Sequence, residues 1–441
     1  MEIMDKNQIR NIVRQMDYSK SEIEIDLLTD NIKDNIDNQL YDFSLYRKDI
    51  FTQQGKKRIV YSYPNLSTEA VMCQYLKKQI DRNFRIRYAS RNRIMNVFFN
   101  VLPVIKDMND FVIIRADFKS FFDSVLSRHV YDRYIKESLM SRWDKEILEQ
   151  YIEEFKYCYA GLCLSNGLTE IVCREFDSRI RAHLSKYGMF FYERYVDDIL
   201  LITNKYISQN QFCNVIQHTI QEVFGDSPVK INMSPGKFSY ITRRNLSTSQ
   251  KFNFLGYEFE IRKVTGKNPI CFKYGIAEKK RKKYTGIIER AFIQFKKDGD
   301  IELLRQRLKI YSSRVVIART IGSSSYDWLT KGVVANYNEL QFHMDALEPQ
   351  TKDFLKNLYV KLLSKHGCVM PYFLKQSLTE ESIYNLESNM KRNRSIMFEK
   401  NIGVSESTLL KWIRKLNPEY CNEDKDYYRM VIDYLALIKV E

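Results

Sequence analysis

The chain has 441 residues, of which 44% are hydrophobic and 13% aromatic, enough to bury a substantial core. Its 70 lysines and arginines outnumber 55 aspartates and glutamates, for a net charge of +15. This composition excludes a disordered protein, and the positive charge favours a polyanionic partner such as nucleic acid over a small neutral substrate. A generally basic protein without such a partner would have the same composition.

The cysteines and the hydrophobic pattern narrow the class of protein further. The eight cysteines are scattered, with no CxxC pair and no histidine at zinc-finger spacing, which is typical of reduced thiols rather than of a disulfide framework. The N-terminal segment is charged throughout, and no apolar run approaches the length needed to span a bilayer. We therefore expect a cytoplasmic protein without a membrane anchor.

The order of predicted elements indicates an α+β protein with a helical second half. Residues 1–50 look mainly helical, and residues 55–66 have the pattern of a turn followed by a short β-rich piece. Between 111 and 260, apolar strand-like runs alternate with helical stretches, which is typical of an α/β or α+β unit. After the basic run 278–284, every segment up to Glu441 looks helical.

Three carboxylates stand at the ends of apolar segments. Asp117 follows the strand-like run 111–114, while Asp197 and Asp198 lie at a predicted hairpin turn after residues 189–195. Burying adjacent carboxylates is costly unless positive charge meets them. If the two strands are neighbours, the carboxylates converge at one sheet end, where hard oxygen ligands suit Mg²⁺ or Mn²⁺. Two such ions activate an attacking hydroxyl and stabilise a leaving oxygen in phosphoryl transfer.

Six short motifs in a fixed order carry a resemblance to a known family. They are KKRIVYSYP at 56–64, DFKSFF at 117–122, GLCLSNGLT at 161–169, YVDD at 195–198, VKINMSPGKF at 229–238 and FNFLGYEF at 252–259. Together they resemble the fingers motif and motifs A to E of the reverse transcriptase family. The resemblance implies a right-hand polymerase fold, with fingers and palm, followed by an all-helical thumb-like C-terminal region.

The resemblance also implies where the domains and the metal ligands lie. The expected division is an N-terminal helical region and fingers at 1–107, a palm with a finger insertion at 108–275, and a helical thumb-like and C-terminal domain at 276–441. Asp117, Asp197 and Asp198 are the predicted catalytic residues. Two Mg²⁺ or Mn²⁺ ions would be held by Asp117 and Asp197, with the backbone carbonyl of Phe118 as an extra ligand. Asp198 is a weaker ligand, an electrostatic supporter, or alternatively a simple turn residue.

Two further groups of residues are predicted to meet the substrates. The nucleotide-binding residues are Lys57, Arg58, Phe122, Asn166, Gly167 and Lys237, and the primer grip is Phe254, Leu255 and Gly256. Arg58, with Lys56 or Lys57, would bind the triphosphate, because a planar guanidinium matches phosphate oxygens. Lys237 would neutralise or protonate the departing pyrophosphate, although a surface lysine is the alternative. Phe122 would leave no room for a 2′-hydroxyl, unless it is an ordinary core phenylalanine.

One motif departs from the common family pattern and sets the expected function. Ser165, Asn166 and Gly167 stand where common reverse transcriptases carry Pro-Gln-Gly. With the long C-terminal region, this departure resembles the bacterial abortive-infection and defence-associated, or unknown-group, reverse transcriptases. The resemblance implies a DNA polymerase in anti-phage defence, RNA-directed or template-independent, with non-standard template or primer use. The alternatives are an RNA-synthesising polymerase and a nucleic-acid-binding protein with a degenerate polymerase fold.

The expected partners follow from the same resemblance. They are RNA, DNA or both, deoxynucleoside triphosphates, and either a non-coding RNA or a partner defence protein; no membrane is expected. The sequence leaves the oligomeric state, the template, the primer and the defence trigger open.

Overall fold

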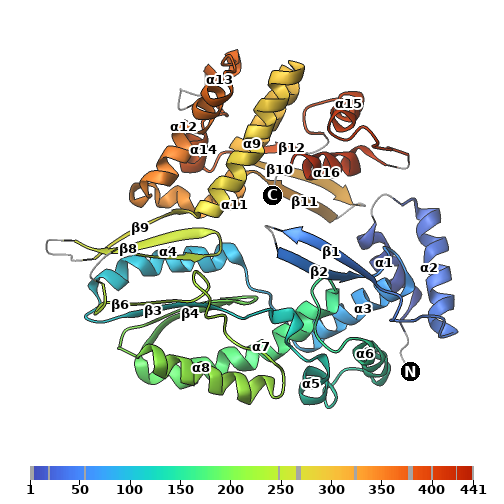
Figure 1. The fold of residues 1–441 in the computed structure, drawn as a ribbon. Coiled ribbons are helices and arrows are strands. Elements are labelled where there is room, and N and C mark those ends of the chain that lie inside the picture. Colours follow the sequence, from blue (N-terminus) through green and yellow to red (C-terminus); the bar gives the residue numbers. More distant parts are fainter. Residues whose placement is uncertain are drawn as a thin grey trace. The chain divides into compact units, whose positions relative to one another are not determined.

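The computed structural model describes residues 4–17, 20–53, 56–246, 249–264, 270–321, 325–375, 381–398, 401–423 and 425–439. The chain folds into two units, each with its own core (Figure 1). One unit comprises Met1–Ile94 and Asp107–Asn245, and the other comprises Met95–Lys106 and Leu246–Glu441. The mixture of helices and strands predicted from the sequence is confirmed.

Five helices of the first unit, α1, α2, α3, α6 and α8, begin after a residue whose side chain caps the helix, whereas α5 and α7 do not. They are α1 (Lys6–Met16), α2 (Glu22–Asp37), α3 (Thr68–Asn83), α5 (Ser127–Val130), α6 (Arg142–Glu154), α7 (Cys163–Leu184) and α8 (Gln209–Phe224). At the starts of α1, α2 and α8, the side chains of Asp5, Ser21 and Ser208 form capping boxes with the third helical residue. Each box satisfies backbone N–H groups that would otherwise lack partners. The helices expected within residues 1–50 are therefore present.

A four-stranded antiparallel sheet forms the centre of the first unit. Its strands are β3 (Val112–Asp117), β4 (Met189–Tyr195), β5 (Asp198–Thr203) and β6 (Ser239–Thr242), in the order β4-β5-β3-β6. All six residues of β3 are buried, as are five of the six residues of β5, because both strands are nearly continuous apolar runs. Helices α7 and α8 pack against each other and lie along one face of the sheet (Figure 1).

A two-stranded hairpin precedes α3 in the first unit. Strand β1 (Arg47–Gln53) pairs antiparallel with β2 (Lys56–Ser62), so that Phe51 lies opposite Arg58 and Thr52 opposite Lys57. The second strand was predicted from its β-branched and aromatic residues. Its partner β1 was not, since residues 1–50 looked mainly helical.

The second unit contains a β-meander and most of the C-terminal helices. Strands β7 (Gln250–Phe254), β8 (Tyr257–Lys263) and β9 (Ile270–Ile276) form an antiparallel sheet. The helices are α9 (Glu278–Asp298), α10 (Ile301–Ser312), α11 (Val333–Asn336), α12 (Pro349–His366), α13 (Tyr372–Lys375), α14 (Leu386–Arg392), α15 (Glu406–Leu416) and α16 (Tyr427–Leu437). Helix α4 (Arg91–Asp107) joins the two units, and its Phe98 and Phe99 pack on Phe259 of the meander.

The prediction that the chain is helical throughout after residue 276 is wrong where three strands occur. Strands β10 (Arg314–Ile321), β11 (Ser325–Lys331) and β12 (Ser395–Phe398) form a sheet in the order β11-β10-β12. Strand β10 contains the run Val315, Val316 and Ile317, whose β-branched side chains favour extended backbone. It pairs antiparallel with β11 and parallel with the distant β12, a long-range pairing that no local periodicity reveals.

The predicted three-region division stays a prediction. The meander that was assigned to the palm region belongs to the same unit as the C-terminal helices. Among the helices that the structure describes, none combines the length and the apolar composition required to cross a bilayer.

Candidate active site

Strand β5 lies between β3 and β4 in the central sheet, so the two strands that were predicted to be neighbours both pair with β5 instead. Strand β3 ends at Asp117 and β5 begins at Asp198, and the two residues lie directly opposite each other in the antiparallel ladder. Asp197 occupies the β4–β5 turn beside Val196, whose φ of 57° is in the left-handed region. The Phe118 N–H donates to the Asp197 carbonyl at 3.2 Å, which ties this turn to the end of β3. All three carboxylates therefore belong to one end of the sheet.

Two basic side chains meet these carboxylates. The Arg115 guanidinium pairs through Nη2 with Asp198 Oδ1 and lies 3.9 Å from Asp117 Oδ2. Its Nη1 donates to the carbonyl oxygens of Gly236, at 3.3 Å, and of Lys237. The Lys237 ammonium pairs with Asp117 Oδ2. Arg115 was missed by the sequence analysis, although a residue two positions before Asp117 shares its face of the strand.

The positive charges of Arg115 and Lys237 do not fully neutralise the three carboxylates. Burial, reinforced by the charges of Asp198 and Asp117, raises the pKa of Asp197 to about 6. Burial also raises the pKa of Asp198, against the opposing effect of Arg115. Asp117 is 2% exposed, and its Oδ1 is buried without a hydrogen-bond partner. A buried carboxylate oxygen without a partner beside two carboxyls of raised pKa fits a site for hard divalent cations such as Mg²⁺ or Mn²⁺.

The backbone around Phe118 leaves its carbonyl oxygen out of the local strand pairing. Phe118 forms an isolated antiparallel β-bridge with Ile231, but the residues on either side of this pair make its hydrogen bonds. The Asn232 N–H donates to the Asp117 carbonyl at 2.8 Å, and the Lys119 N–H donates to the Lys230 carbonyl at 2.9 Å. The predicted extra metal ligand is thus not used in this ladder.

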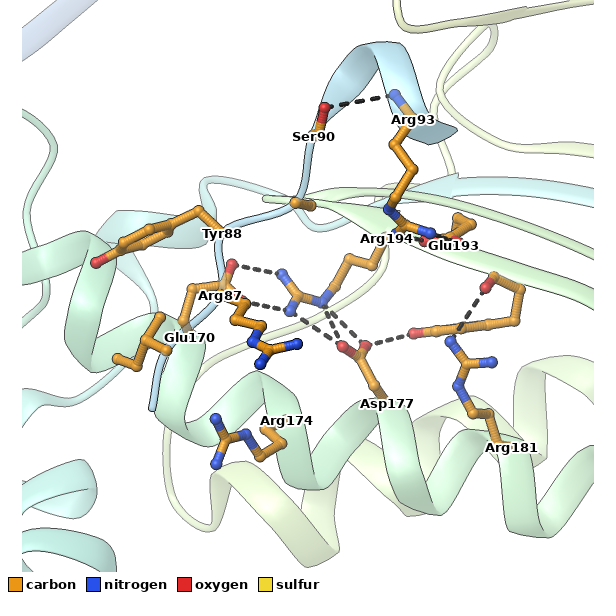
Figure 2. Close-up of a pocket in the computed structure, with 13 residues that line it drawn as sticks. Arg87, Tyr88, Ser90, Arg93, Glu170, Arg174, Asp177, Arg181, Glu193 and Arg194 are labelled. Carbon is orange, nitrogen blue, oxygen red and sulfur yellow. Dashed lines mark hydrogen bonds and ion pairs between the residues drawn. The ribbon is translucent and has the colours of Figure 1, made fainter. Parts of the chain in front are cut away.

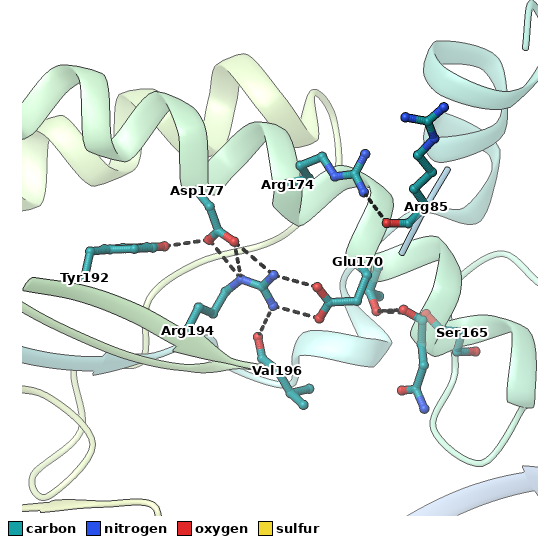
Figure 3. Close-up of polar contacts among 10 residues, drawn as sticks. Arg85, Ser165, Glu170, Arg174, Asp177, Tyr192, Arg194 and Val196 are labelled. Atoms are coloured by element: carbon teal, nitrogen blue, oxygen red, sulfur yellow. Dashed lines mark hydrogen bonds and ion pairs between the residues drawn. The ribbon is translucent and has the colours of Figure 1, made fainter. Parts of the chain in front are cut away.

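The buried Arg194 side chain joins helix α7 to the β4–β5 turn that carries Asp197, as Figure 3 shows. The Arg194 guanidinium binds Glu170 in a fork with distances of 3.0 and 2.8 Å, and it also contacts Asp177 at 2.9 Å. Its Nη1 donates to the Val196 carbonyl at 2.9 Å. Because both acidic residues come from α7, this helix fixes the position of the turn that carries Asp197. The sequence analysis missed this charge in a strand that otherwise looked apolar.

The divergent motif, residues 165–167, lies at the start of α7, and its three residues differ in burial and contacts. Ser165 is buried and donates its hydroxyl to the Tyr159 carbonyl at 2.6 Å, whereas Asn166 is exposed. Gly167 is buried, and a Cβ there would lie 3.1 Å from Ile80 Cγ2, so this glycine permits close packing between α7 and α3. Of these three residues, only Asn166 is exposed.

The closest backbone approach near this motif occurs at a residue that the sequence analysis did not select. Gly161 has a φ of 98°, and a Cβ there would collide with Val60 Cγ1 and the Tyr61 carbonyl oxygen. The Tyr61 N–H donates to the Ala160 carbonyl at 3.0 Å. This loop therefore anchors β2, the strand on which Lys57 and Arg58 are exposed. Arg58 shares a strand face with Val60, which meets the loop. The Lys56 side chain lies outside the described residues.

The aromatic residues after Asp117 divide between core and surface. Phe121 is 3% exposed and stacks on Phe118, with ring centroids 4.9 Å apart. Phe122 is half-buried in the short 3₁₀ turn Phe121–Asp123, and its ring centroid lies 5.7 Å from that of Phe121. Phe121 is thus the core residue, and the Phe122 ring remains partly accessible.

The predicted primer grip belongs to the second unit. Phe254 ends β7, is 1% exposed and contacts Phe98, while Leu255 and Gly256 form the β7–β8 turn with positive φ. Phe254 is therefore a core residue of the meander. Leu255 and Gly256 are the members of the group at a half-buried turn.

An arginine-lined pocket of about 550 Å³ lies in the first unit and is lined in part by the same Arg194, Glu170 and Asp177 (Figure 2). Its charged lining residues are Arg87, Arg93, Arg174, Arg181, Arg194, Glu170, Asp177 and Glu193. Arg93 pairs in a fork with Glu193 at 3.0 and 2.9 Å. Since five arginines stand against three carboxylates, the lining has a formal charge of +2 and favours an anion.

An antiparallel sheet with carboxylates gathered at one end and two helices along one face is the arrangement expected of a polymerase palm. Residues 70–259 match the family model for reverse transcriptase (RNA-dependent DNA polymerase). The matched segment contains Asp117, Asp197 and Asp198, and it supports the assignment of a reverse-transcriptase-like polymerase domain to this part of the chain.

Two solved structures of telomerases are similar to the chain. An apo telomerase from Candida tropicalis, truncated from its C-terminal domain, has 14% identity and a TM-score of 0.33, over 49% of this chain and 53% of that chain. A telomerase from Candida albicans in complex with a fragment of telomeric RNA has 10% identity and a TM-score of 0.40, over 89% of this chain and 66% of that chain. The chain thus spans 53% and 66% of the lengths of these two proteins. No curated protein matches the chain.

Proposed function

We propose that the chain is a reverse-transcriptase-like DNA polymerase that adds deoxynucleotides by two-metal phosphoryl transfer. The observation that carries this proposal is the meeting of Asp117, Asp197 and Asp198 at one sheet end. In the reaction, the 3′-oxygen of a primer forms a bond to the α-phosphorus of the nucleotide, the bond to the β-phosphate bridge breaks, and pyrophosphate leaves. Bound divalent ions would activate the attacking hydroxyl and neutralise the leaving group.

The protein's own residues have distinct roles in this proposal. Asp117 and Asp197 would hold the cations, while Arg115 fixes the Asp198 carboxylate and compensates its charge. Lys237, whose side chain is 47% exposed, can carry a proton to the leaving pyrophosphate. Arg58 and Lys57, exposed on β2, would bind the triphosphate. Phe122 would select the deoxy sugar.

The second part of the proposal concerns the biological role of the polymerase and its partners. The divergent segment at Ser165, Asn166 and Gly167 supports membership of the bacterial defence-associated reverse transcriptases, with non-standard template or primer use in abortive infection. RNA or DNA is the expected partner, and the arginine-lined pocket offers positive charge for its phosphates. A non-coding RNA or a defence protein is a further proposed partner. The eight free cysteines support a cytoplasmic location.

One experiment separates this function from its alternatives. The purified chain is incubated with MgCl₂ and labelled deoxynucleotides or ribonucleotides, and the product is digested with DNase, RNase or protease. We expect Mg²⁺-dependent incorporation of deoxynucleotides that DNase removes. A product sensitive to RNase would instead assign RNA synthesis. Label retained only by the protein, without chain growth, would favour protein labelling or a binding function.

Substitutions in the carboxylate group supply the control. Asp117→Asn and Asp197→Asn should lower incorporation by at least about 10³-fold while the protein remains folded, because each removes a metal ligand. Asp226→Asn, a carboxyl-to-amide change at an exposed position of the same unit, should retain full activity. Activity of a folded Asp197→Asn protein equal to that of the unmodified chain would overturn the assignment.

A further inference from the structure

Two helices of the first unit bring two imidazoles and a carboxylate together away from the catalytic aspartates. His183 lies in the last turn of α7, and His218 and Glu222 lie four residues apart on one face of α8. One ligand atom from each of the three residues lies within 4.8 Å of the other two. Within the described part of the chain, no other cluster of His, Cys, Asp and Glu side chains meets this criterion.

A neighbouring threonine determines which nitrogen of His183 is available. The Thr219 hydroxyl donates to the Val215 carbonyl at 2.8 Å, so its oxygen is the acceptor in the 3.0 Å contact with His183 Nδ1. The proton of a neutral His183 must therefore reside on Nδ1, which leaves a lone pair on Nε2. Such a hydrogen bond to the remote ring nitrogen is the usual way in which a protein orients a metal-binding imidazole.

The Glu222 carboxylate contributes an oxygen that accepts no hydrogen bond. Its Oε2 is buried and lacks a hydrogen-bond partner, although it lies 3.8 Å from His183 Nε2 and 3.5 Å from His218 Nδ1. Ligand atoms around a tetrahedral Zn²⁺ ion with bonds of about 2.05 Å are about 3.3 Å apart. The two nitrogen-to-oxygen distances need to shorten by only a few tenths of an ångström to match this geometry.

Arg179 keeps the Glu222 carboxylate in place, and the ends of the two helices favour a cation. Arg179 Nη1 lies 3.5 Å from the other oxygen of Glu222, Oε1, so it restrains the side chain without occupying Oε2. His183 and Glu222 lie in the last turns of their helices, where the backbone carbonyls give negative potential. That potential partly offsets the repulsion that Arg179 exerts on a bound cation.

We propose that His183 Nε2, His218 Nδ1 and Glu222 Oε2 form a binding site for a transition-metal ion of the Zn²⁺ class. The mixed nitrogen and oxygen donors suit Zn²⁺, whereas the catalytic aspartates offer oxygen donors that suit Mg²⁺ or Mn²⁺. The ion links the end of α7 to α8. Because α7 also carries Glu170 and Asp177, which hold Arg194, the link stabilises the helix that supports the catalytic turn. A fourth position remains for water or for a ligand from a partner.

The test is a titration of the full chain with ZnCl₂ in excess MgCl₂, which saturates oxygen-ligand sites. We expect the unmodified protein to bind one more equivalent of Zn²⁺ than His218→Ala, or to bind it at least about 10-fold more tightly. His218 is 66% exposed, so its replacement leaves the fold intact. Co²⁺ in place of Zn²⁺ should give visible absorption bands typical of nitrogen ligands, and Glu222→Gln should weaken them.

Two controls make the outcome decisive. His366→Ala removes an imidazole that contacts Glu289 at 2.8 Å but has no third donor, so it should leave Zn²⁺ binding unchanged. Thr219→Ser keeps the hydroxyl and should bind Zn²⁺ normally, whereas Thr219→Val should lower the affinity. Equal stoichiometry and affinity for the unmodified protein and His218→Ala would overturn the proposal, as would Zn²⁺ binding that only Asp197→Asn removes.

Discussion

Asp117 lies directly opposite Asp198 across the β3–β5 ladder, a pairing of like charges at a position where such pairs normally destabilise a sheet. Arg115 compensates this repulsion, since its guanidinium lies within ion-pair distance of both carboxylates. The same side chain holds the loop at Gly236 and Lys237 through two backbone carbonyls. One arginine therefore joins the carboxylates to the loop that carries Lys237.

Replacing this arginine should be costly. Arg115→Met should lower the free energy of unfolding by about 3 kcal/mol, because it leaves carboxylates and backbone carbonyls without their partner in a largely buried site. Urea denaturation measures the loss. The matched control, Arg142→Ala, breaks an exposed pair with Glu146 and should change stability by less than about 0.5 kcal/mol. Similar losses for the two variants would show that Arg115 has no special structural role.

The raised pKa of Asp197 predicts a pH-dependent stability of the protein when no divalent cation is present. Its carboxyl titrates at about 6 in the folded protein and near 3.8 in the unfolded chain. The folded state therefore binds this proton more tightly, and the stability that the proton contributes is lost as the pH rises from about 4 to about 6. A shift of about two pH units corresponds to at most about 3 kcal/mol.

The substitution Asp197→Asn should remove this loss of folding stability at higher pH. In EDTA, the variant should exceed the unmodified protein in free energy of unfolding by a larger margin at about pH 7.5 than at about pH 5. Adding MgCl₂ should narrow the margin, because the ion stabilises only the ionised carboxylate. Asp226→Asn, at an exposed position, serves as the control. A margin that is independent of pH would contradict the assigned pKa.

Gly161 should be more sensitive to a methyl group than an ordinary glycine. Gly161→Ala places a Cβ against Tyr61 and Val60 and forces a non-glycine residue to a φ of 98°, so it should destabilise the protein by about 2 kcal/mol or more. Limited proteolysis within β1 and β2 should also become faster. Gly286→Ala, inside α9 with 3.8 Å to the nearest side-chain atom, should be neutral or stabilising. Equal effects would mean that the loop at Gly161 does not anchor the hairpin.

The central sheet and its carboxylates could be predicted because their signals are local. Apolar runs mark β3, β4 and β5, and a pair of aspartates between two such runs indicates a hairpin turn. Asp117 was predicted to join them on the assumption that its strand neighbours residues 189–195. In the sheet, β5 lies between β3 and β4, so Asp117 instead meets Asp198 directly across the β3–β5 pair. Arg115 and Arg194 were missed because a charged residue in an apolar strand does not reveal which partners will surround it.

Features formed by distant segments could not be predicted. Strand β10 has a β-branched run, but its partner β12 lies far along the chain. Because the segments between them have helical patterns, the whole region was predicted to be helical. His183 and His218 likewise show no metal-binding spacing in sequence, since only the packing of α7 on α8 brings them together. Gly161 was overlooked because its positive φ depends on the approach of the β2 backbone.

The last prediction concerns the sugar of the nucleotide. Phe122 is half-buried five residues after Asp117, while the neighbouring Phe121 fills the core position beside Phe118. A ring near the ribose of a nucleotide bound at Asp117 would clash with a 2′-hydroxyl and offer it no hydrogen bond. Such a penalty can amount to a few kcal/mol, or to selectivity on the order of 10²-fold.

Phe122→Val should therefore admit ribonucleotides and largely preserve deoxynucleotide incorporation. The measurement is the ratio of kcat/KM for a ribonucleotide to that for the matching deoxynucleotide, which should rise on the order of 10²-fold because the smaller side chain leaves room for the hydroxyl. Phe121→Leu alters the buried neighbour and should lower stability without changing this ratio, which separates sugar selection from core packing. If the Phe122→Val enzyme is active and its ratio equals that of the unmodified protein, Phe122 does not select the sugar, and the preference for DNA synthesis must depend on other residues.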